Sequence, residues 1–176
     1  MNTPTAKVLI SSEEISTKVG ELAKAIDEHY QDSQAPLVLI GLLRGSVIFM
    51  ADLCRALHHA HEMDFMTVSS YGAGTVSGGD VKILKDLDTD IAGKDVLIVE
   101  DIIDSGRTLS KVVDVLKTRN PNSIELCTIV SKPSRREIEM DVRFLGFEVD
   151  DVFIVGYGLD FNQAYRHLPY IGEIGL

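Results

Sequence analysis

The chain has 176 residues, which is enough for one domain with a substantial buried core. Hydrophobic residues make up 45% and charged residues 25% of it, as in soluble globular proteins, so the composition excludes a disordered or fibrous chain. The formal net charge of −10 disfavours a general DNA- or RNA-binding role, because such a surface repels a nucleic-acid backbone.

Neither end of the chain nor its interior carries a membrane signal. No apolar run approaches the ~18 residues that a membrane helix needs. The N-terminal residues MNTPTAK have neither the basic nor the apolar segment of a signal peptide. We therefore expect a cytoplasmic protein that binds neither nucleic acid nor membrane.

The first half of the chain predicts two helices and two strands. Ser11–Glu14 has the Ser-x-x-Glu form of a capping box, and apolar residues follow it at helical spacing (Ile15, Val19, Leu22 and Ile26). Residues 37–40 are a short apolar run that ends at Gly41, which indicates a buried strand. The spacing of apolar residues over 50–57 indicates the next helix, and residues 62–69 a further strand.

Residues 72–79, GAGTVSGG, contain four glycines and little that could anchor them. This composition is typical of a mobile loop, so the segment is a candidate lid over a site. A hairpin tip without a function is an equal alternative on this pattern alone.

The second half of the chain continues the alternation of strands and helices. Apolar runs predict strands at 81–84, 96–99, 124–130 and 152–155, and a clear helical stripe lies between two of them (Leu109, Val112, Val113 and Leu116). All-apolar strands that alternate with helices predict an α/β fold, with a mostly parallel central sheet covered by helices on both faces. No repeat or linker divides the chain, so we expect residues 1–176 to form a single domain.

Carboxylates and a glycine turn follow the strand at 96–99. Glu100 and Asp101 come directly after it, and Asp104-Ser105-Gly106-Arg107-Thr108 leads into the next helix. Ligands of open parallel sheets bind beyond the carboxyl ends of strands, and free amides at a helix N-terminus bind phosphate. Carboxylates bind sugar hydroxyls or hold Mg²⁺, so the stretch predicts a sugar phosphate. The alternative is a pair of solvated acids followed by an ordinary helix cap.

Two other features suggest metal or disulfide chemistry but predict neither. Cys54, His58, His59 and His61 would be spread around a helix rather than converging as zinc ligands do, so a solvated helix end is favoured. Cys54 and Cys127 are the only cysteines. In a chain without a secretion signal we expect both to be reduced and buried.

Residues 96–109, VLIVEDIIDSGRTL, resemble the phosphoribosyl diphosphate (PRPP) signature of type I phosphoribosyltransferases. Four other segments extend the resemblance to bacterial hypoxanthine phosphoribosyltransferases, over about residues 8–172: LLRGS (42–46), VSSYG (68–72), SKPSRR (131–136) and VGYGLDFNQAYRHLPYIG (155–172). The signature by itself indicates the superfamily, and the other segments indicate its purine-salvage branch. The resemblance implies the type I phosphoribosyltransferase fold, with a small hood and a mobile lid.

The resemblance also implies the residues that bind PRPP. Glu100 and Asp101 would bind the ribose hydroxyls, and the loop from Asp104 through Ser105, Gly106 and Arg107 to Thr108 would surround the 5′-phosphate. Pyrophosphate would contact Arg166 and the loop Leu43-Arg44-Gly45, which often contains a non-proline cis peptide in this family. Without the family, Arg44 could equally be a surface arginine. Ser70 and Tyr71 would begin the lid.

The purine, the metal and the proton transfer complete this set of expectations. Lys132 would donate to the 6-oxo group, Phe153 would stack on the base, and Ile154 and Asp160 would lie against it. Asp104 would act as the general base. Glu100, Asp101 and Asp160 would hold Mg²⁺, partly through water. On the residues alone, Lys132 would be a solvated loop charge and Phe153 ordinary core.

Two alternatives remain at this point. A nucleotide-sensing regulator on the same fold would need a basic face for RNA or DNA, which the acidic composition disfavours. An enzyme that prefers xanthine and guanine would differ in the contacts around Ile154 and Asp160. We expect hypoxanthine as the first substrate and guanine as the slower one. The family usually forms dimers or tetramers, and a homotetramer is the expected assembly.

Overall fold

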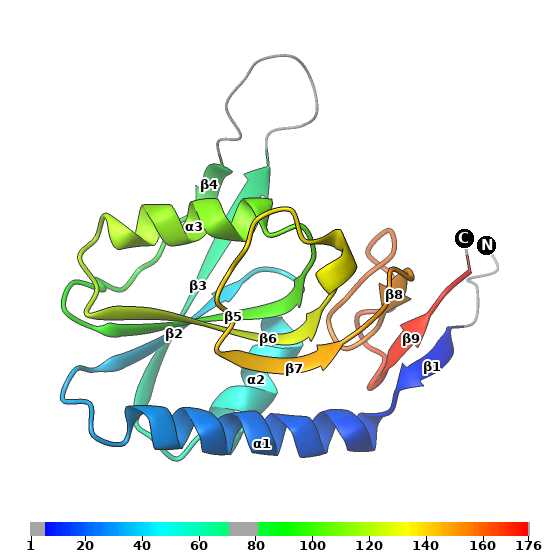
Figure 1. The fold of residues 1–176 in the computed structure, drawn as a ribbon, viewed down its shortest axis with the longest axis horizontal. Helices are drawn as coiled ribbons and strands as arrows, with labels where there is room; N and C mark the ends of the chain where they lie inside the picture. Colours follow the sequence, from blue (N-terminus) through cyan, green and yellow to red (C-terminus); the bar gives the residue numbers. More distant parts are fainter. Residues whose placement is uncertain (1–5, 71–80, 176) are drawn as a thin grey trace.

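The computed structural model describes residues 6–70 and 81–175, and these form two β-sheets and the helices that cover them. A central six-stranded sheet has the strand order β4-β3-β2-β5-β6-β7, and a three-stranded sheet, β1-β9-β8, lies beside it (Figure 1). The elements in chain order are β1 (Lys7–Ile10), α1 (Ser12–Tyr30), β2 (Leu37–Leu42), α2 (Val47–Ala56), β3 (His61–Ser70), β4 (Val81–Lys85), β5 (Asp95–Ile103), α3 (Arg107–Lys117), β6 (Ser123–Ser131), the 3₁₀ turn η1 (Pro133–Arg135), β7 (Phe144–Glu148), β8 (Ile154–Val155) and β9 (Ile171–Glu173).

The central sheet is parallel except at one edge. Strands β3, β2, β5, β6 and β7 pair in parallel, and only β4 pairs antiparallel, with β3. Parallel neighbours have their carboxyl ends on the same side of a sheet. The segments that follow β2, β5 and β6 therefore meet at one edge, where an open α/β sheet binds its ligand.

Both faces of the sheet are buried, which explains why its strands are apolar without interruption. Along β2, Leu37 and Leu39 pack into the core with α1 and α2, whereas Val38 and Ile40 pack into the core with α3. Figure 1 shows α3 on one face and α1 and α2 on the other. Alternate residues of each strand thus need apolar neighbours on opposite sides. The prediction of a mostly parallel sheet with helices on both faces is confirmed.

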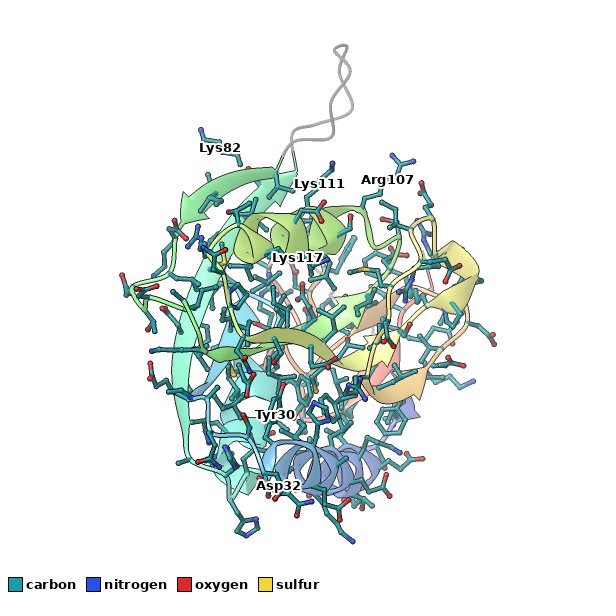
Figure 2. All side chains as sticks on the ribbon, turned by 60° about the vertical axis from the view of Figure 1, so that its left-hand side comes forward. Tyr30, Asp32, Lys82, Arg107, Lys111 and Lys117 are labelled. Carbon is teal, nitrogen blue, oxygen red and sulfur yellow. The ribbon has the colours of Figure 1, made fainter. Side chains whose placement is uncertain are left out.

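The local signals in the helices are present as predicted. Ser11 Oγ accepts from the Glu14 N–H at 3.2 Å, and the Glu14 carboxylate accepts from the Ser11 N–H at 2.8 Å, which completes the capping box of α1. Tyr30, at the end of α1, lies between this helix and the sheet (Figure 2). Helix α2 ends one residue earlier than the predicted segment, since Leu57 caps it from an extended conformation.

The small sheet, called the hood below, was implied by the resemblance, but its strands were not predicted. The expected strand at 152–155 is wrong in extent, because only Ile154–Val155 forms a strand and it pairs with β9 in the hood. The last strand of the central sheet is instead β7, which was not predicted. Strands of two to five residues carry little periodic signal, so pairing partners far along the chain determine them.

The structure describes both cysteines, and both are free thiols. Cys127 is buried in β6 as expected, whereas Cys54 is only partly buried. The predicted lid at 72–79 lies outside the described residues. No helix within 6–70 and 81–175 is long and apolar enough to span a membrane.

Candidate active site

The acids that open the predicted site belong to the central strand. Strand β5 continues to Ile103, so Glu100 and Asp101 lie within it and not after it, as the sequence had suggested. Glu100 still pairs in register with Thr128 of β6. Each acid retains some exposed surface, but its carboxyl is surrounded by protein. The strand therefore holds both carboxyls rigidly at the binding edge of the sheet.

Burial dominates the electrostatics of this pair. It raises the pKa of Glu100 well above the usual range, and the neighbouring charge of Asp101 raises that pKa further. Burial also raises the pKa of Asp101 to about 6. The N–H of Ile102 and the positive charge of Arg166 lower this pKa but do not offset the effect of burial. Asp160 adds to the increase. The structure thus holds two carboxyls, whose ionisation burial opposes, where the sequence predicted ribose and metal binding.

The loop after β2 lies against these acids. The peptide between Leu43 and Arg44 is cis, as the resemblance implied. Gly45 is buried, and a Cβ atom on it would lie 1.6 Å from the Asp101 carboxylate. Arg44 itself is exposed. Only a glycine at position 45 lets the predicted pyrophosphate loop approach Asp101 so closely.

The loop after β8 completes this side of the site. The guanidinium of Arg166 lies 2.8 Å from the Asp160 carboxylate and donates to the carbonyl of Gly158 at 2.6 Å. Gly158 has φ +100°, and a Cβ on it would lie 2.1 Å from the carbonyl of Gly45. Asp160 and Arg166 are therefore held beside Gly45, and the predicted metal and pyrophosphate residues come together from three separate segments.

The predicted phosphate loop has the expected form of a turn into a helix. Gly106 has φ +81° and caps α3, and a Cβ there would lie 3.0 Å from the carbonyl of Ile138. The first N–H groups of a helix have no intrahelical acceptor, so those of α3 can donate to a phosphate, and the Arg107 N–H lies 3.4 Å from Ser105 Oγ in the same turn. Arg107 points outward from the start of α3 (Figure 2), where its guanidinium pairs with Glu137. Ser105 and Thr108 are in the same turn.

Lys132 lies next to the predicted general base. Its backbone N–H donates to the carbonyl of Ile103, the residue before Asp104, at 3.0 Å. Its side chain is 7% exposed, and Nζ donates to the carbonyl of Val152 at 2.7 Å. The reading of Lys132 as a solvated loop charge is wrong. A buried ammonium that donates to a backbone carbonyl beside Phe153 is suited to bind the oxo group of a base.

Phe153 is exposed rather than part of the core. Its side chain is 40% exposed, so the prediction of ordinary core packing is wrong. The ring contacts that of Phe161 edge-on, with centroids 5.6 Å apart, which fixes it near Asp160. Ile154, by contrast, is buried in β8. An exposed aromatic ring held at its edge presents a face on which a purine could stack.

The remaining candidates lie elsewhere or outside the described residues. Ser70 ends β3 and pairs with Val81, whereas Tyr71 belongs to the segment that the structure does not describe. In the histidine cluster, His58 Nδ1 lies 3.1 Å from an Asp27 carboxylate oxygen, and His61 Nδ1 lies 2.8 Å from the carbonyl of His59. These side chains have local partners and do not converge.

Three residues of the site were missed by the sequence reasoning. Arg135 follows Lys132 and Asp151 precedes Phe153, and an ion pair places Arg135 Nε 2.8 Å from Asp104. Gly158 contacts the loop at Gly45. The two glycines of the segment VGYG were the only feature of the sequence that could have indicated a close contact at Gly158. Exposed charged residues such as Arg135 and Asp151 carry no pattern that identifies a partner.

Comparison with known proteins identifies the family. Residues 9–162 match the family described as phosphoribosyl transferase domain. Hypoxanthine phosphoribosyltransferase of Escherichia coli K12 is 59% identical over 170 residues, which are 97% of this chain and 96% of that protein. Hypoxanthine-guanine phosphoribosyltransferase of Bacillus subtilis is 55% identical over 168 residues, 96% and 92% of the two chains. A crystal structure of hypoxanthine phosphoribosyltransferase from Staphylococcus aureus matches with a TM-score of 0.92 at 41% identity and covers 99% of this chain and 96% of that one.

The chain belongs to the hypoxanthine phosphoribosyltransferase family. It is therefore a pentosyltransferase that uses PRPP and a purine base, on the type I phosphoribosyltransferase fold.

The donor set of this phosphoribosyltransferase fits a magnesium ion. Glu100, Asp101 and Asp160 offer carboxylate oxygens, which Mg²⁺ prefers. The raised pKa values of Glu100 and Asp101 show that their negative charge is poorly balanced, and a divalent cation would offset it. Among the residues that the structure describes, no three such side chains are close enough to hold a metal by themselves, so water or substrate oxygens would complete the coordination.

Replacing Gly45 by alanine should impair PRPP use by the phosphoribosyltransferase. The new methyl group would overlap the Asp101 carboxylate, and a displacement of about 1 Å at a reacting centre costs about 10²-fold in rate. We expect kcat/KM for PRPP to fall by at least this factor in steady-state assays. Gly20→Ala in α1 is the matched control, because nothing lies within 4 Å of its added Cβ. Wild-type kinetics for Gly45→Ala would contradict the close approach of this loop.

Replacing Asp101 by asparagine should stabilise the metal-free phosphoribosyltransferase at pH 7.5. The pKa of about 6 in the folded chain exceeds the ordinary 3.8, so ionisation of Asp101 destabilises the fold. This penalty is absent below pH 3.8 and complete above about pH 6. We expect Asp101→Asn to raise the free energy of unfolding by about 1–3 kcal/mol at pH 7.5, and by less at pH 4.5. Urea unfolding in EDTA measures both, and a variant less stable than wild type at pH 7.5 would refute the assignment.

Proposed function

We propose that this enzyme transfers the phosphoribosyl group of PRPP to N9 of a 6-oxopurine, with hypoxanthine preferred and guanine slower, releasing pyrophosphate. The products are IMP and GMP, as in purine salvage. The observation that carries the proposal is that Lys132 donates its backbone N–H to the carbonyl of Ile103, just before Asp104, and its Nζ to the carbonyl of Val152, just before Phe153. An ammonium donor, a carboxylate and an aromatic ring are thereby linked through neighbouring backbone, which supports binding of a planar oxo-base.

PRPP binds across the ends of the neighbouring strands. Glu100 and Asp101 accept hydrogen bonds from the ribose 2′- and 3′-hydroxyls through their carboxyl oxygens. The N–H groups and hydroxyls of residues 104–108 receive the 5′-phosphate at the positive end of the α3 dipole. An enzyme of net charge −10 can thus bind a polyanion, because local amides and cations, and not the overall charge, provide the attraction.

The leaving group occupies the side of the site near Arg166. As the bond between ribose C1′ and pyrophosphate breaks, charge accumulates on the pyrophosphate oxygens. Arg166 and the backbone amides of residues 43–45 stabilise this charge. Mg²⁺, held by Glu100, Asp101 and Asp160 partly through water, would neutralise part of the same charge when bound.

The nucleophile is N9 of the purine, which the residues around the base hold and orient. Phe153 stacks on the base, Ile154 forms a wall of its pocket, and Asp160 lies at its C2 edge. Lys132 donates to O6 and thereby fixes the tautomer. As N9 bonds to C1′, Asp104 accepts the proton from N7, so the base does not acquire a full positive charge.

We also propose a cytoplasmic location and a homo-oligomeric assembly, a dimer or tetramer, with no nucleic-acid or membrane partner. Val47 and Ile48, adjacent at the start of α2, are each 38% exposed and would be covered in an oligomer. Sedimentation of the purified enzyme tests the assembly, and a monomer at micromolar concentration would refute it.

A panel of four bases tests the function directly. Hypoxanthine, guanine, xanthine and adenine are each supplied with PRPP and Mg²⁺, and product formation is followed by absorbance. The proposal requires the highest kcat/KM with hypoxanthine, a lower value with guanine, and loss of turnover in EDTA. A preference for xanthine, or turnover that EDTA does not affect, would contradict the base or the metal assignment respectively.

Replacing Asp104 by asparagine removes the proposed proton acceptor. Because an amide cannot take the N7 proton, we expect kcat to fall by about 10²–10⁴-fold, the usual contribution of general acid–base catalysis. The affinity for PRPP should be largely kept, since the phosphate is bound through amides of the same loop. Asp114→Asn, an exposed position of α3, is the control. Turnover near wild type would exclude Asp104 as the base.

Replacing Lys132 by alanine should weaken purine binding and discrimination between 6-oxo and 6-amino bases. A hydrogen bond to a charged group contributes about 1.5–3 kcal/mol, so KM for hypoxanthine should rise by about 10–100-fold. The ratio of kcat/KM for hypoxanthine to that for adenine should fall. Lys111→Ala is the control, because Lys111 points into solvent from α3 (Figure 2). If adenine stays as poor a substrate as for wild type, Lys132 does not set the selectivity.

A further inference from the structure

Arg135 joins the two halves of the proposed site. It ends the turn η1, directly after β6. Its Nε lies 2.8 Å from Oδ1 of Asp104, and its Nη1 donates to Oδ1 of Asp151 at 3.1 Å. Asp151 precedes Val152, whose carbonyl accepts from Lys132. A single guanidinium therefore bridges the phosphate loop and the segment that would recognise the purine.

The contact with Asp104 leaves this carboxylate able to accept a proton. Oδ1 of Asp104 is buried, yet no N–H or O–H among the described residues is aligned to hydrogen-bond with it, Arg135 included. The guanidinium of Arg135 lies against one side of the carboxyl and fixes its orientation. The Asp104 side chain as a whole is 46% exposed, so its other atoms remain accessible to a ligand. This arrangement suits a general base that Arg135 orients and that the purine reaches through the exposed atoms of the carboxyl.

The residues that follow Arg135, Glu137 and Ile138, contact the rest of the phosphate loop (residues 104–108). The N–H groups of Glu137 and Ile138 donate to the carbonyl of Ser105 at 3.0 and 3.1 Å. The Glu137 carboxylate pairs with Arg107, and Ile138 packs against Gly106. Residues 135–138 thus contact four successive residues of the loop. Movement of this segment would displace Asp104 together with the phosphate site.

Stability does not explain the Arg135 bridge. The side chains of Arg135, Asp104 and Asp151 are 50%, 46% and 54% exposed. Ion pairs with this exposure add little to the free energy of unfolding. Substitution of Arg135 should therefore leave the fold intact, and an effect on turnover would report on the site.

We propose that Arg135 is a positioning residue for phosphoribosyl transfer, which keeps Asp104 oriented toward purine N7 and links that orientation, through Asp151, to the purine segment. In the step concerned, the N9–C1′ bond forms, the bond from C1′ to pyrophosphate breaks, and the N7 proton moves to Asp104. Arg135 contacts none of the reacting atoms and acts through Asp104. The inference rests on the proposed role of Asp104 as the base.

A double-mutant cycle between Arg135 and Asp104 tests the proposal. Arg135→Gln and Arg135→Lys are made in the wild type, and Arg135→Gln also in the Asp104→Asn background. Arg143→Gln is the matched control: this arginine is 44% exposed and pairs with Glu125 at 3.0 Å, at the opposite end of β6. For each variant kcat, KM for PRPP, KM for hypoxanthine and the thermal midpoint are measured.

A positioning role predicts a specific pattern of results. Arg135→Gln should lower kcat about tenfold with KM for PRPP within about threefold of wild type, because the loss is in the transition state. In the Asp104→Asn background the same change should lower kcat by less than about twofold, since the residue through which it acts is already gone. Arg135→Lys keeps a charge beside Asp104 and should recover most of the lost kcat. Arg143→Gln should match wild type.

Contrary outcomes distinguish an error in the role of Asp104 from an error in the role of Arg135. If Asp104→Asn has nearly normal turnover, the assignment of the base is wrong. If Asp104→Asn is impaired but Arg135→Gln lowers kcat by the same factor in both backgrounds, Arg135 acts elsewhere and the inference is wrong. Unchanged kcat for Arg135→Gln, or equal kcat for the Gln and Lys variants, would also overturn it.

Discussion

The carboxylates of Glu100 and Asp101 are held within the central strand β5, where burial opposes their ionisation. A chain optimised for stability alone would place apolar or hydrogen-bonded neutral groups there. The rest of the site follows from keeping these two charges in place. Gly45 allows one loop to lie against Asp101, and Arg166 brings a positive charge from another. The ribose and metal of the substrate complex would then offset a charge that the free protein balances poorly.

The sheet determines which segments can meet around these acids. Because β2, β5 and β6 are parallel and adjacent, the loops that follow them reach the same edge without any long excursion of the chain. In the proposed mechanism one of these loops binds pyrophosphate, one binds ribose and phosphate, and one binds the base. Phe153 and Asp160 lie before and after β8 of the hood, so the purine would lie between two sheets that fold from distant parts of the sequence.

The segment that follows β6 connects these functions. Lys132 faces the purine side, Arg135 contacts Asp104, and Glu137 contacts the start of α3. A short, partly exposed stretch thus touches the base segment and the phosphate loop at once. The proposed general base depends for its orientation on groups that are too exposed to contribute much to stability, which makes function at this point separable from folding.

Much of the protein could be predicted from its sequence, for reasons that are local. The capping box at Ser11, the apolar stripe of α3 and the doubly buried strands each follow from spacing within a few residues, and the turn at Gly106 follows from its composition. What the tertiary structure decided involves residues far apart in the chain. The pairing of β8 with β9, the approach of Gly45 to Asp101, the exposure of Phe153 and the bridge from Arg135 to Asp104 and Asp151 have no local signal. Periodicity reports which face of an element is buried, whereas only the folded chain determines which distant charge or glycine lies opposite.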